Sequence, residues 1–178
     1  MNTTDNNILS LFNDLPFFSL PQTQQQRLFS FGKVRKVPAR ESLIQEGTTD
    51  PVLVVLLEGA CQVRKLVPES EFSPLREVTL RRTFAPSIFG EKSFLESRPH
   101  SSSVVTTTPC QVWELSFEAF QKFLNGDINL AIYLKRSLSH VVVQRLYESE
   151  TTLATILAYK DTFYQKYEEI SFDDGSPS

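Results

Sequence analysis

The chain has 178 residues, of which 40% are hydrophobic, and its formal net charge is −3 at pH 7. This length and apolar content suit one domain with a sizeable buried core. The small negative charge disfavours DNA binding by this chain alone, because neutralising phosphates needs a basic surface. No apolar run approaches the length of a membrane span, so the sequence predicts a soluble chain without a membrane contact.

The first 31 residues predict a short tail and two helices. Residues 1–7 are polar and are expected to be disordered. Apolar residues recur at helical spacing from Ile8 to Phe31, and Pro16 and Pro21 divide this segment into two short helices.

The hydrophobic period then changes to that of strands. Strands are expected at 33–38, 42–45, 52–57, 61–67 and 76–84. Turns are expected where Glu precedes Gly at 46–47 and 58–59, and a solvated loop at 68–75. The adjacent Arg81 and Arg82 are expected on a solvated strand face.

The two cysteines, Cys61 and Cys110, lie in strand-like segments, and the polar start of the chain does not resemble a signal peptide. We therefore expect two buried thiols in the reducing cytoplasm rather than a disulfide. No CxxC motif or His/Cys cluster has the spacing of a metal site, so no metal is expected.

The second half of the chain predicts two strands and two helices. The strands are expected at 102–108 and 111–115. Ser116 is a suitable N-cap for a helix over 117–124.

From Asp127 the chain has no Pro or Gly until Gly175, and apolar residues recur at helical spacing, which predicts one long helix with a break near 149–152. The apolar stripe of this helix exceeds what one flank of a barrel needs. We therefore predict a homodimer through the helix, the alternative being packing against its own barrel.

The stretch SIFGEKSFLESRPHSSSVVT, residues 87–106, follows the period of neither a helix nor a strand. Gly90 allows the backbone to approach a ligand closely, and the Glu91 carboxylate is able to accept two hydroxyl groups. Backbone N–H groups at the start of a short helix are suited to an anion. The stretch therefore predicts a binding loop.

This stretch resembles the phosphate-binding cassette of cyclic-nucleotide-binding domains, the superfamily of catabolite-activator transcription factors and protein kinase A regulatory subunits. Gly90 and Glu91 match its Phe-Gly-Glu motif, and residues 99–104 match its second half in kind. Two positions depart from the pattern. His100 stands where the family usually has the arginine that pairs with the cyclic phosphate, and Lys92 stands where an aliphatic residue is usual.

The resemblance implies an α+β, mainly β fold: an eight-stranded, jelly-roll-like β-roll flanked by N-terminal helices and a long C-terminal helix. The expected parts are a tail at 1–7, the roll with its flanking helices at 8–126, the helix and its extension at 127–168, and an acidic disordered tail at 169–178. In the transcription-factor branch a helix-turn-helix module follows the long helix. The remaining residues are expected to leave no room for one, so the output is expected to pass to a partner protein.

The resemblance also implies a nucleotide site. Glu91 would accept from the ribose 2′-hydroxyl, while backbone N–H groups near Gly90 and Ser101 would face the phosphate. The further candidates are Ser102 for a hydroxyl contact, Ser149 for the base, Val63 and Phe94 for an apolar wall, and Arg98 as a substitute cation.

His100 determines how strongly such a site would bind. Arginine presents a permanently charged fork to a phosphate, whereas histidine has a shorter reach and is only partly charged near neutrality. Losing one charge-assisted contact costs about 1.5 to 3 kcal/mol, roughly ten- to a hundredfold in affinity. The substitution predicts a site that is weak, pH-sensitive or repurposed.

Two functions remain open from the sequence. The first is a cytoplasmic, non-enzymatic sensor that binds a cyclic purine nucleotide, most simply cAMP with cGMP as the alternative, and signals through its C-terminal helix. The second is a dimeric interaction module of the same fold that binds no nucleotide. Catalysis is not expected, because the chain has no paired carboxylates, no P-loop and no serine with a recognisable base.

Overall fold

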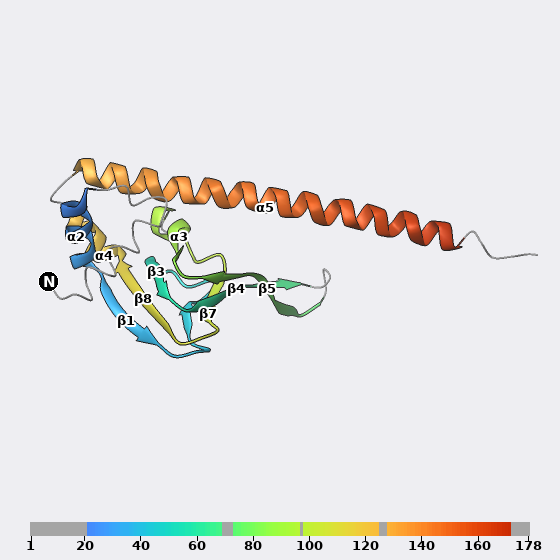
Figure 1. The fold of residues 1–178 in the computed structure, drawn as a ribbon, viewed down its shortest axis with the longest axis horizontal. Helices are drawn as coiled ribbons and strands as arrows, with labels where there is room; N and C mark the ends of the chain where they lie inside the picture. The colour runs from blue at the N-terminus through green and yellow to red at the C-terminus, as the bar shows by residue number, and fades with distance from the viewer. Residues whose placement is uncertain (1–20, 69–72, 97, 125–127, 172–178) are drawn as a thin grey trace, which may run out of the picture. The chain divides into compact units, whose positions relative to one another are not determined.

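The computed structural model describes residues 21–68, 73–96, 98–124 and 128–171. Eight strands form two four-stranded antiparallel sheets, with the orders β1-β8-β3-β6 and β2-β7-β4-β5 (Figure 1). The strands are β1 (Lys33–Val37), β2 (Ser42–Ile44), β3 (Val52–Glu58), β4 (Ala60–Pro68), β5 (Leu75–Phe84), β6 (Ser87–Phe89), β7 (Ser103–Thr106) and β8 (Cys110–Ser116). The described helices are α2 (Gln22–Phe31), α3 (Glu91–Glu96), α4 (Phe117–Leu124) and α5 (Ile128–Ser171). The predicted mainly β, α+β roll is confirmed.

The position of β3 in the fold explains why its sequence is a continuous apolar run. Leu53, Val55 and Leu57 belong to the core cluster that includes the helices, whereas Val54 and Leu56 belong to the cluster between the two sheets. Successive side chains of a strand point to opposite faces, so a strand covered on both sides needs apolar residues at every position. β3 is therefore buried on both faces and contributes to both core clusters.

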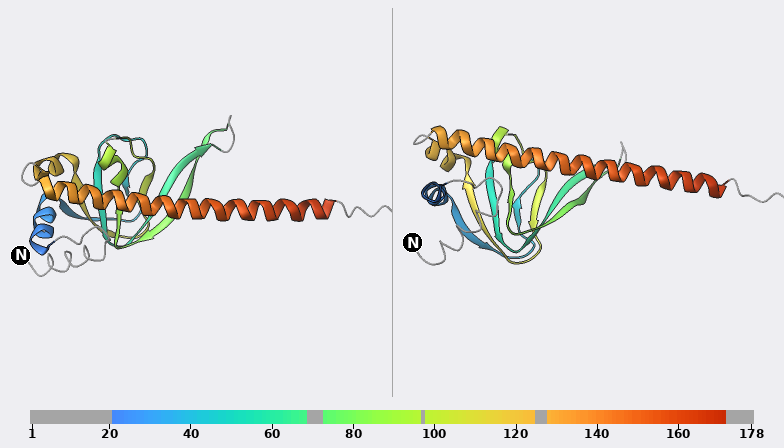
Figure 2. Two further views of the ribbon diagram at one scale, coloured as in Figure 1. Left: turned by 90° about the horizontal axis from the view of Figure 1, so that it is seen from above. Right: turned by 45° about the horizontal axis from the view of Figure 1, so that its top comes forward.

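The helices close the outer face of the sheet that contains β8. Trp113 of β8 is fully buried there, and its indole N–H donates to the carbonyl of Phe29 in α2 at 3.1 Å. Leu134 and Leu138 of α5 lie in the same core cluster. Figure 2 shows α2 and α4 at one end of the roll, beside the start of α5.

Most of the helical predictions are confirmed. Ser116 caps α4, because its hydroxyl accepts from the Ala119 N–H at 3.2 Å. The predicted break near 149–152 is wrong, since α5 is one uninterrupted helix. The hydroxyls of Ser149 and Thr152 donate to the carbonyls four residues earlier, so these polar residues are satisfied within the helix. The first of the two predicted N-terminal helices lies outside the described residues.

The chain divides into two compact units, Met1–Val141 and Val142–Ser178. The first contains the roll and the start of α5, and the second contains the rest of that helix. The predicted boundary at 126–127 and the predicted tail at 1–7 lie outside the described residues. The predicted C-terminal tail at 169–178 begins too early, because α5 continues to Ser171, and the rest of that tail lies outside the described residues.

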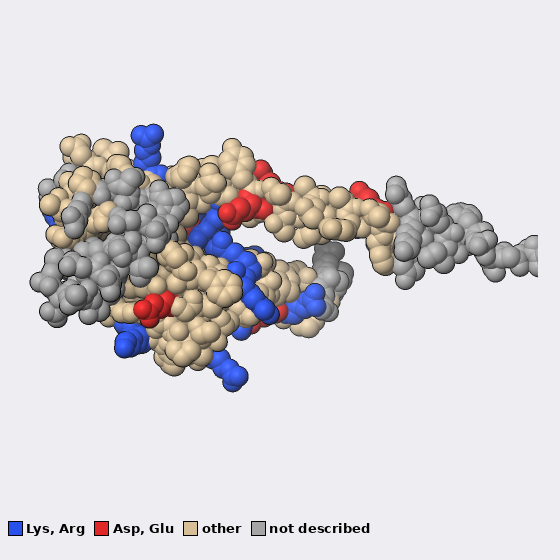
Figure 3. Space-filling view, in the orientation of Figure 1, with Lys and Arg blue, Asp and Glu red and all other residues tan. Residues whose placement is uncertain are grey.

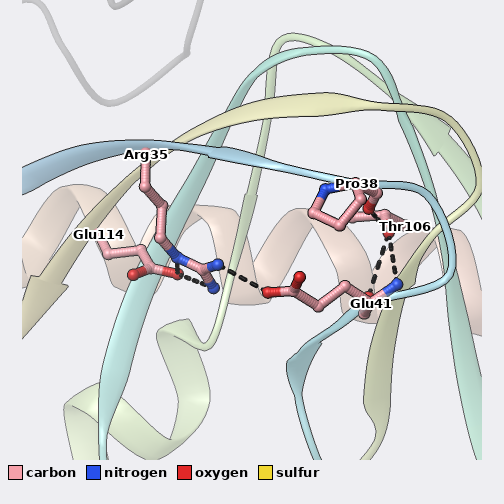
Figure 4. A network of polar contacts seen from close by, with 5 residues as sticks. All are labelled: Arg35, Pro38, Glu41, Thr106 and Glu114. Carbon is pink, nitrogen blue, oxygen red and sulfur yellow. Dashed lines mark hydrogen bonds and ion pairs between the residues drawn. The ribbon is translucent and has the colours of Figure 1, made fainter.

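A polar network joins the β1–β2 turn to the strands beside it (Figure 4). The Arg35 guanidinium binds the carboxylate of Glu114 on β8 at 2.9 Å and that of Glu41 in the turn at 2.8 Å. The Thr106 hydroxyl accepts from the Glu41 N–H and donates to the carbonyl of Pro38 at 2.7 Å. Hydrogen bonds to Glu114 raise the pKa of Arg35, so this cation stays charged. The network is a structural support at the end of the 87–106 stretch, where Thr106 contacts the β1–β2 turn.

The paired arginines of β5 do not share a face, contrary to the prediction. Arg82 is exposed, whereas Arg81 is partly buried. Adjacent residues of a strand point to opposite sides of the sheet, and near the end of β5 Arg81 and Thr83 are partly buried while Arg82 and Phe84 are exposed.

Candidate functional site

Gly90 makes the sharp transition from β6 into α3. Its φ is +82°, in the left-handed region that favours glycine. A Cβ at this position would also overlap the Val52 carbonyl of β3. The Gly90 carbonyl accepts from the Phe94 N–H at 3.0 Å and so begins the helix. Glycine is therefore required twice, by the backbone conformation and by the close approach of β3.

Glu91 is the first residue of α3, and only 2% of its surface is exposed. An ionised carboxylate offers acceptor oxygens only, and a buried one is costly unless donors surround it. The N-terminus of a helix favours negative charge. The fold thus places a buried acceptor directly after the tight turn at Gly90.

His100 is turned into the protein and is 5% exposed. Its ring Nδ1 lies 2.9 Å from the Ser93 hydroxyl of α3, and its Nε2 lies 3.1 Å from the carbonyl of Asp50. Its own N–H donates to the Thr48 carbonyl, and its own carbonyl accepts from the Gly47 N–H, both at 2.9 Å. The side chain and main chain of His100 therefore tie the β2–β3 loop to the binding loop.

The partners of the ring admit both charge states of His100. A carbonyl only accepts, so Nε2 must carry a hydrogen toward Asp50. In the neutral ring the Ser93 hydroxyl donates to Nδ1. In the charged ring Nδ1 donates to Ser93, whose hydroxyl donates to the Gly90 carbonyl 3.1 Å away. Every group stays hydrogen-bonded in either state.

Glu46 holds the segment that follows His100. Its carboxylate accepts from the Leu66 N–H at 2.9 Å and from the Lys65 ammonium at 3.2 Å. Lys65 also donates to the carbonyl of Ser101 at 2.7 Å, and the Glu46 N–H donates to the Ser103 hydroxyl at 3.0 Å. Partial burial acts to raise the pKa of Glu46, but the Leu66 amide and Lys65 hold it below its ordinary value. The serine segment is therefore fixed to β4 and to the β2–β3 turn.

The structure does not bring Arg98 to His100. Arg98 is exposed and lies 3.4 Å from the carboxylate of Glu96 at the end of α3. Ser102 is half-buried, and Ser101 is exposed. Of Arg98, His100, Ser101 and Ser102, only His100 has a buried side chain.

The two apolar candidates lie in different core clusters. Phe94 packs against Phe120 and Phe117 of α4, with ring centroids 4.7 and 5.7 Å apart. Val63 lies between the two sheets, opposite Val104 of the cassette strand β7. Val63 is thus the candidate placed inside the roll, whereas Phe94 serves the contact with α4.

Ser149 lies in the second compact unit, where its hydroxyl donates to the Arg145 carbonyl at 2.8 Å. Sequence reasoning missed the contacts that Ser93, the Asp50 carbonyl and Glu46 make at the site. Ser93 had a detectable signal, because it is a polar residue two positions after Glu91. A backbone carbonyl leaves no such signal in a sequence.

Residues 34–127 match the model of the cyclic nucleotide-binding domain family, which covers more than half of the chain. The chain belongs to this family. It is 28% identical over 149 residues to the cAMP-dependent protein kinase regulatory subunit of Mycosarcoma maydis, covering 79% of the chain and 28% of that protein. It is 25% identical over 129 residues to the cAMP-activated global transcriptional regulator CRP of Haemophilus influenzae, covering 72% of the chain and 53% of that protein.

The fold resembles a solved cyclic nucleotide-binding domain from Methylobacillus flagellatus KT, with a TM-score of 0.73 and 24% identity over 84% of this chain and 82% of the other. The chain spans only part of the length of these two curated relatives: 28% of the first and 53% of the second.

Two further properties apply to the part of the chain that the structure describes. It contains no group of three or more His, Cys, Asp or Glu side chains arranged to hold a metal ion. None of the helices described is both long enough and apolar enough to span a membrane.

Proposed function

We propose that the chain is a regulatory domain that binds a cyclic purine nucleotide, most simply cAMP, at the loop formed by Gly90 and α3. The observation that carries this proposal is the buried Glu91 carboxylate, which directly follows the left-handed Gly90. A buried acceptor suits a ribose hydroxyl, and the glycine lets the ligand approach the backbone. The curated relatives named for cAMP support this choice of nucleotide.

His100 bears on the strength of this proposed binding. Its ring is held by hydrogen bonds in both charge states, and only the charged ring attracts a phosphate. Arginine presents a permanently charged fork to a phosphate, whereas histidine has a shorter reach. Binding is therefore expected to be weaker than an arginine at this position would provide.

The same histidine favours a second candidate function. Both ring nitrogens of His100 already have partners within the protein, which is the arrangement expected if the loop binds no nucleotide. The domain would then act through protein contacts alone. In this case the buried Glu91 is part of the structural turn.

Under either function we propose a homodimer through the second unit. Apolar side chains of α5 are exposed there at heptad spacing: Leu146, Leu153, Ile156 and Phe163. Such a seam is typical of paired helices. Sedimentation equilibrium tests it, since Leu153→Lys is expected to convert a dimer into a monomer.

Isothermal titration with cAMP and cGMP at pH 6 and pH 8 tests the nucleotide proposal. Glu91→Gln keeps the side-chain volume and is expected to weaken binding roughly tenfold or more. Glu96→Gln is the matched control, because Glu96 lies on the same helix and is exposed. Absence of heat at millimolar nucleotide from a folded sample would refute the proposal and favour the interaction module.

A further inference from the structure

The second unit carries a row of exposed side chains along one side of α5. Residues at alternating spacings of three and four positions share a side of a helix. One such row, which we call the 143–164 seam, consists of Val143, Leu146, Glu150, Leu153, Leu157, Lys160 and Tyr164. All of these side chains are exposed, and all except Glu150 and Lys160 are apolar or aromatic. Figure 3 shows the surface of this part of the helix as mostly uncharged, with acidic side chains at a few places.

The two charged members of the seam, Glu150 and Lys160, have no oppositely charged neighbour within their own helix. Side chains meet along a helix when they are three or four positions apart, and the residues at those distances from Glu150 and Lys160 are all uncharged. Asp161 directly follows Lys160, and adjacent residues of a helix do not face each other. The Lys160 ammonium lies instead over the Tyr164 ring, 5.6 Å from its centroid. Both charges are therefore available to another molecule.

An antiparallel pairing of two copies of the helix matches these charges. In a two-fold interface, residue i of one copy contacts residue j of the other, and j contacts i. If Leu153 lies opposite the partner's Leu157, each step forward along one helix is a step back along the other. Glu150 then lies opposite the partner's Lys160. Each charge meets its opposite, and the centre of the pair between the two ion pairs is apolar.

A parallel pairing brings like charges together instead. Identical residues face each other in a parallel two-fold pair, so Glu150 meets Glu150 and Lys160 meets Lys160. The heptad row through Ile156 and Phe163 also contains Lys160, so a parallel pair along that row has the same lysine contact. Like charges placed against each other weaken an interface and exclude the wrong arrangement. The charges of the helix therefore favour the antiparallel orientation.

We infer that two copies of α5 pair antiparallel along the 143–164 seam, with Glu150 of each copy bound to Lys160 of the other. The inference rests on the homodimer proposed above and specifies its orientation and register. Outside each ion pair, Leu146 lies opposite the partner's Tyr164, so the apolar contact continues there. The occupant of this exposed apolar row is thus a second copy of the chain.

The test is sedimentation equilibrium of the full chain with charges reversed at the two positions. Lys160→Glu and Glu150→Lys each create two like-charge contacts in the antiparallel dimer, so each is expected to weaken dimerisation about tenfold or more. The double reversal restores opposite charges and is expected to bring the dissociation constant back to within about threefold of wild type. Glu148→Lys is the matched control, because it reverses the same charge on the side of the helix away from the seam, and a change of about twofold at most is expected.

A spin label on Gln144→Cys reports the orientation independently. Gln144 is exposed and lies near the start of the seam, while both native cysteines are buried. The antiparallel pair places the two labelled positions roughly 30 Å or more apart along the helix axes. A parallel pair places them side by side, about 10 Å apart before the label arms are added.

The outcomes separate the orientation from the homodimer itself. If the wild type dimerises and the single reversals behave as Glu148→Lys does, the antiparallel inference is wrong and the homodimer stands. A short distance between the two labels also overturns it, as does a double reversal that remains as weak as the single ones. If the wild type is monomeric over the whole concentration range, the homodimer and this inference both fail, while the nucleotide proposal is unaffected.

Discussion

Replacing His100 by leucine tests whether the ring holds the binding loop to the β2–β3 loop. Leucine has a similar volume but no hydrogen-bonding group, so His100→Leu removes the contacts to Ser93 at 2.9 Å and to the Asp50 carbonyl at 3.1 Å. Ser93 keeps its bond to the Gly90 carbonyl, whereas the Asp50 carbonyl loses its bond to His100. Two such losses amount to about 2 kcal/mol of unfolding free energy. For a chain of this size that lowers Tm by about 4 to 8 °C.

The assay is thermal unfolding of the ligand-free protein at pH 7, followed by circular dichroism. The control is His140→Leu, the same substitution at an exposed position of α5, for which a change within about 0.5 kcal/mol is expected. A double-mutant cycle with Ser93→Ala should give a coupling of at least about 0.5 kcal/mol. Equal melting temperatures for the two histidine variants, or no coupling to Ser93, would refute the contacts assigned to His100.

Three further predictions concern the turn, the thiols and a carboxylate. Gly90→Ala should cost at least about 2 kcal/mol in urea unfolding, because it combines a left-handed φ with a steric overlap. Burial, with Cys110 beside it, raises the pKa of Cys61 to about 12, so Ellman's reagent should not react with this thiol in the folded protein at pH 8. The pKa of Glu46 is lowered, so Glu46→Gln should reduce the loss of stability in acid.

The glycine prediction has a control, and the two pKa shifts have a definite sign. Gly47 has a φ of +84°, and a Cβ added there would meet no atom within 4 Å, so Gly47→Ala should cost less than Gly90→Ala. The protonated Cys61 thiol contributes its stability below pH 9, and that contribution is lost as the pH rises toward 12. The Glu46 contribution is present above about pH 4.5 and is lost as the pH falls through the lower folded pKa. The glycine argument is contradicted if Gly90→Ala and Gly47→Ala lower the free energy of unfolding equally. The thiol argument is contradicted if Cys61 reacts rapidly with Ellman's reagent. The carboxylate argument is contradicted if Glu46→Gln loses as much stability in acid as the wild type does.

Much of the fold was predictable from local sequence because the signals are local. Apolar residues at strand spacing or in a continuous run marked the strands other than β6 (Ser87–Phe89), which was not predicted, and Ser116 marked the start of α4. The Gly90-Glu91 pair marked the turn from β6 into α3, since only glycine suits a left-handed turn that touches another strand. The long helix was predictable from the absence of Pro and Gly after Asp127.

The contacts of the site were decided by the tertiary structure. The sequence placed His100 in the loop, but its ring direction depends on Ser93 and on the carbonyl of Asp50, which lies fifty residues earlier. Likewise, which of Arg81 and Arg82 faces inward depends on the pairing of β5 with β4, where the register shifts between Val63 and the next residue. A shift of one residue exchanges the two faces of a strand, and no local pattern of two adjacent arginines specifies that register. The sequence by itself therefore determined the family and the turn at Gly90, and the strand pairing decided which side chains share a face.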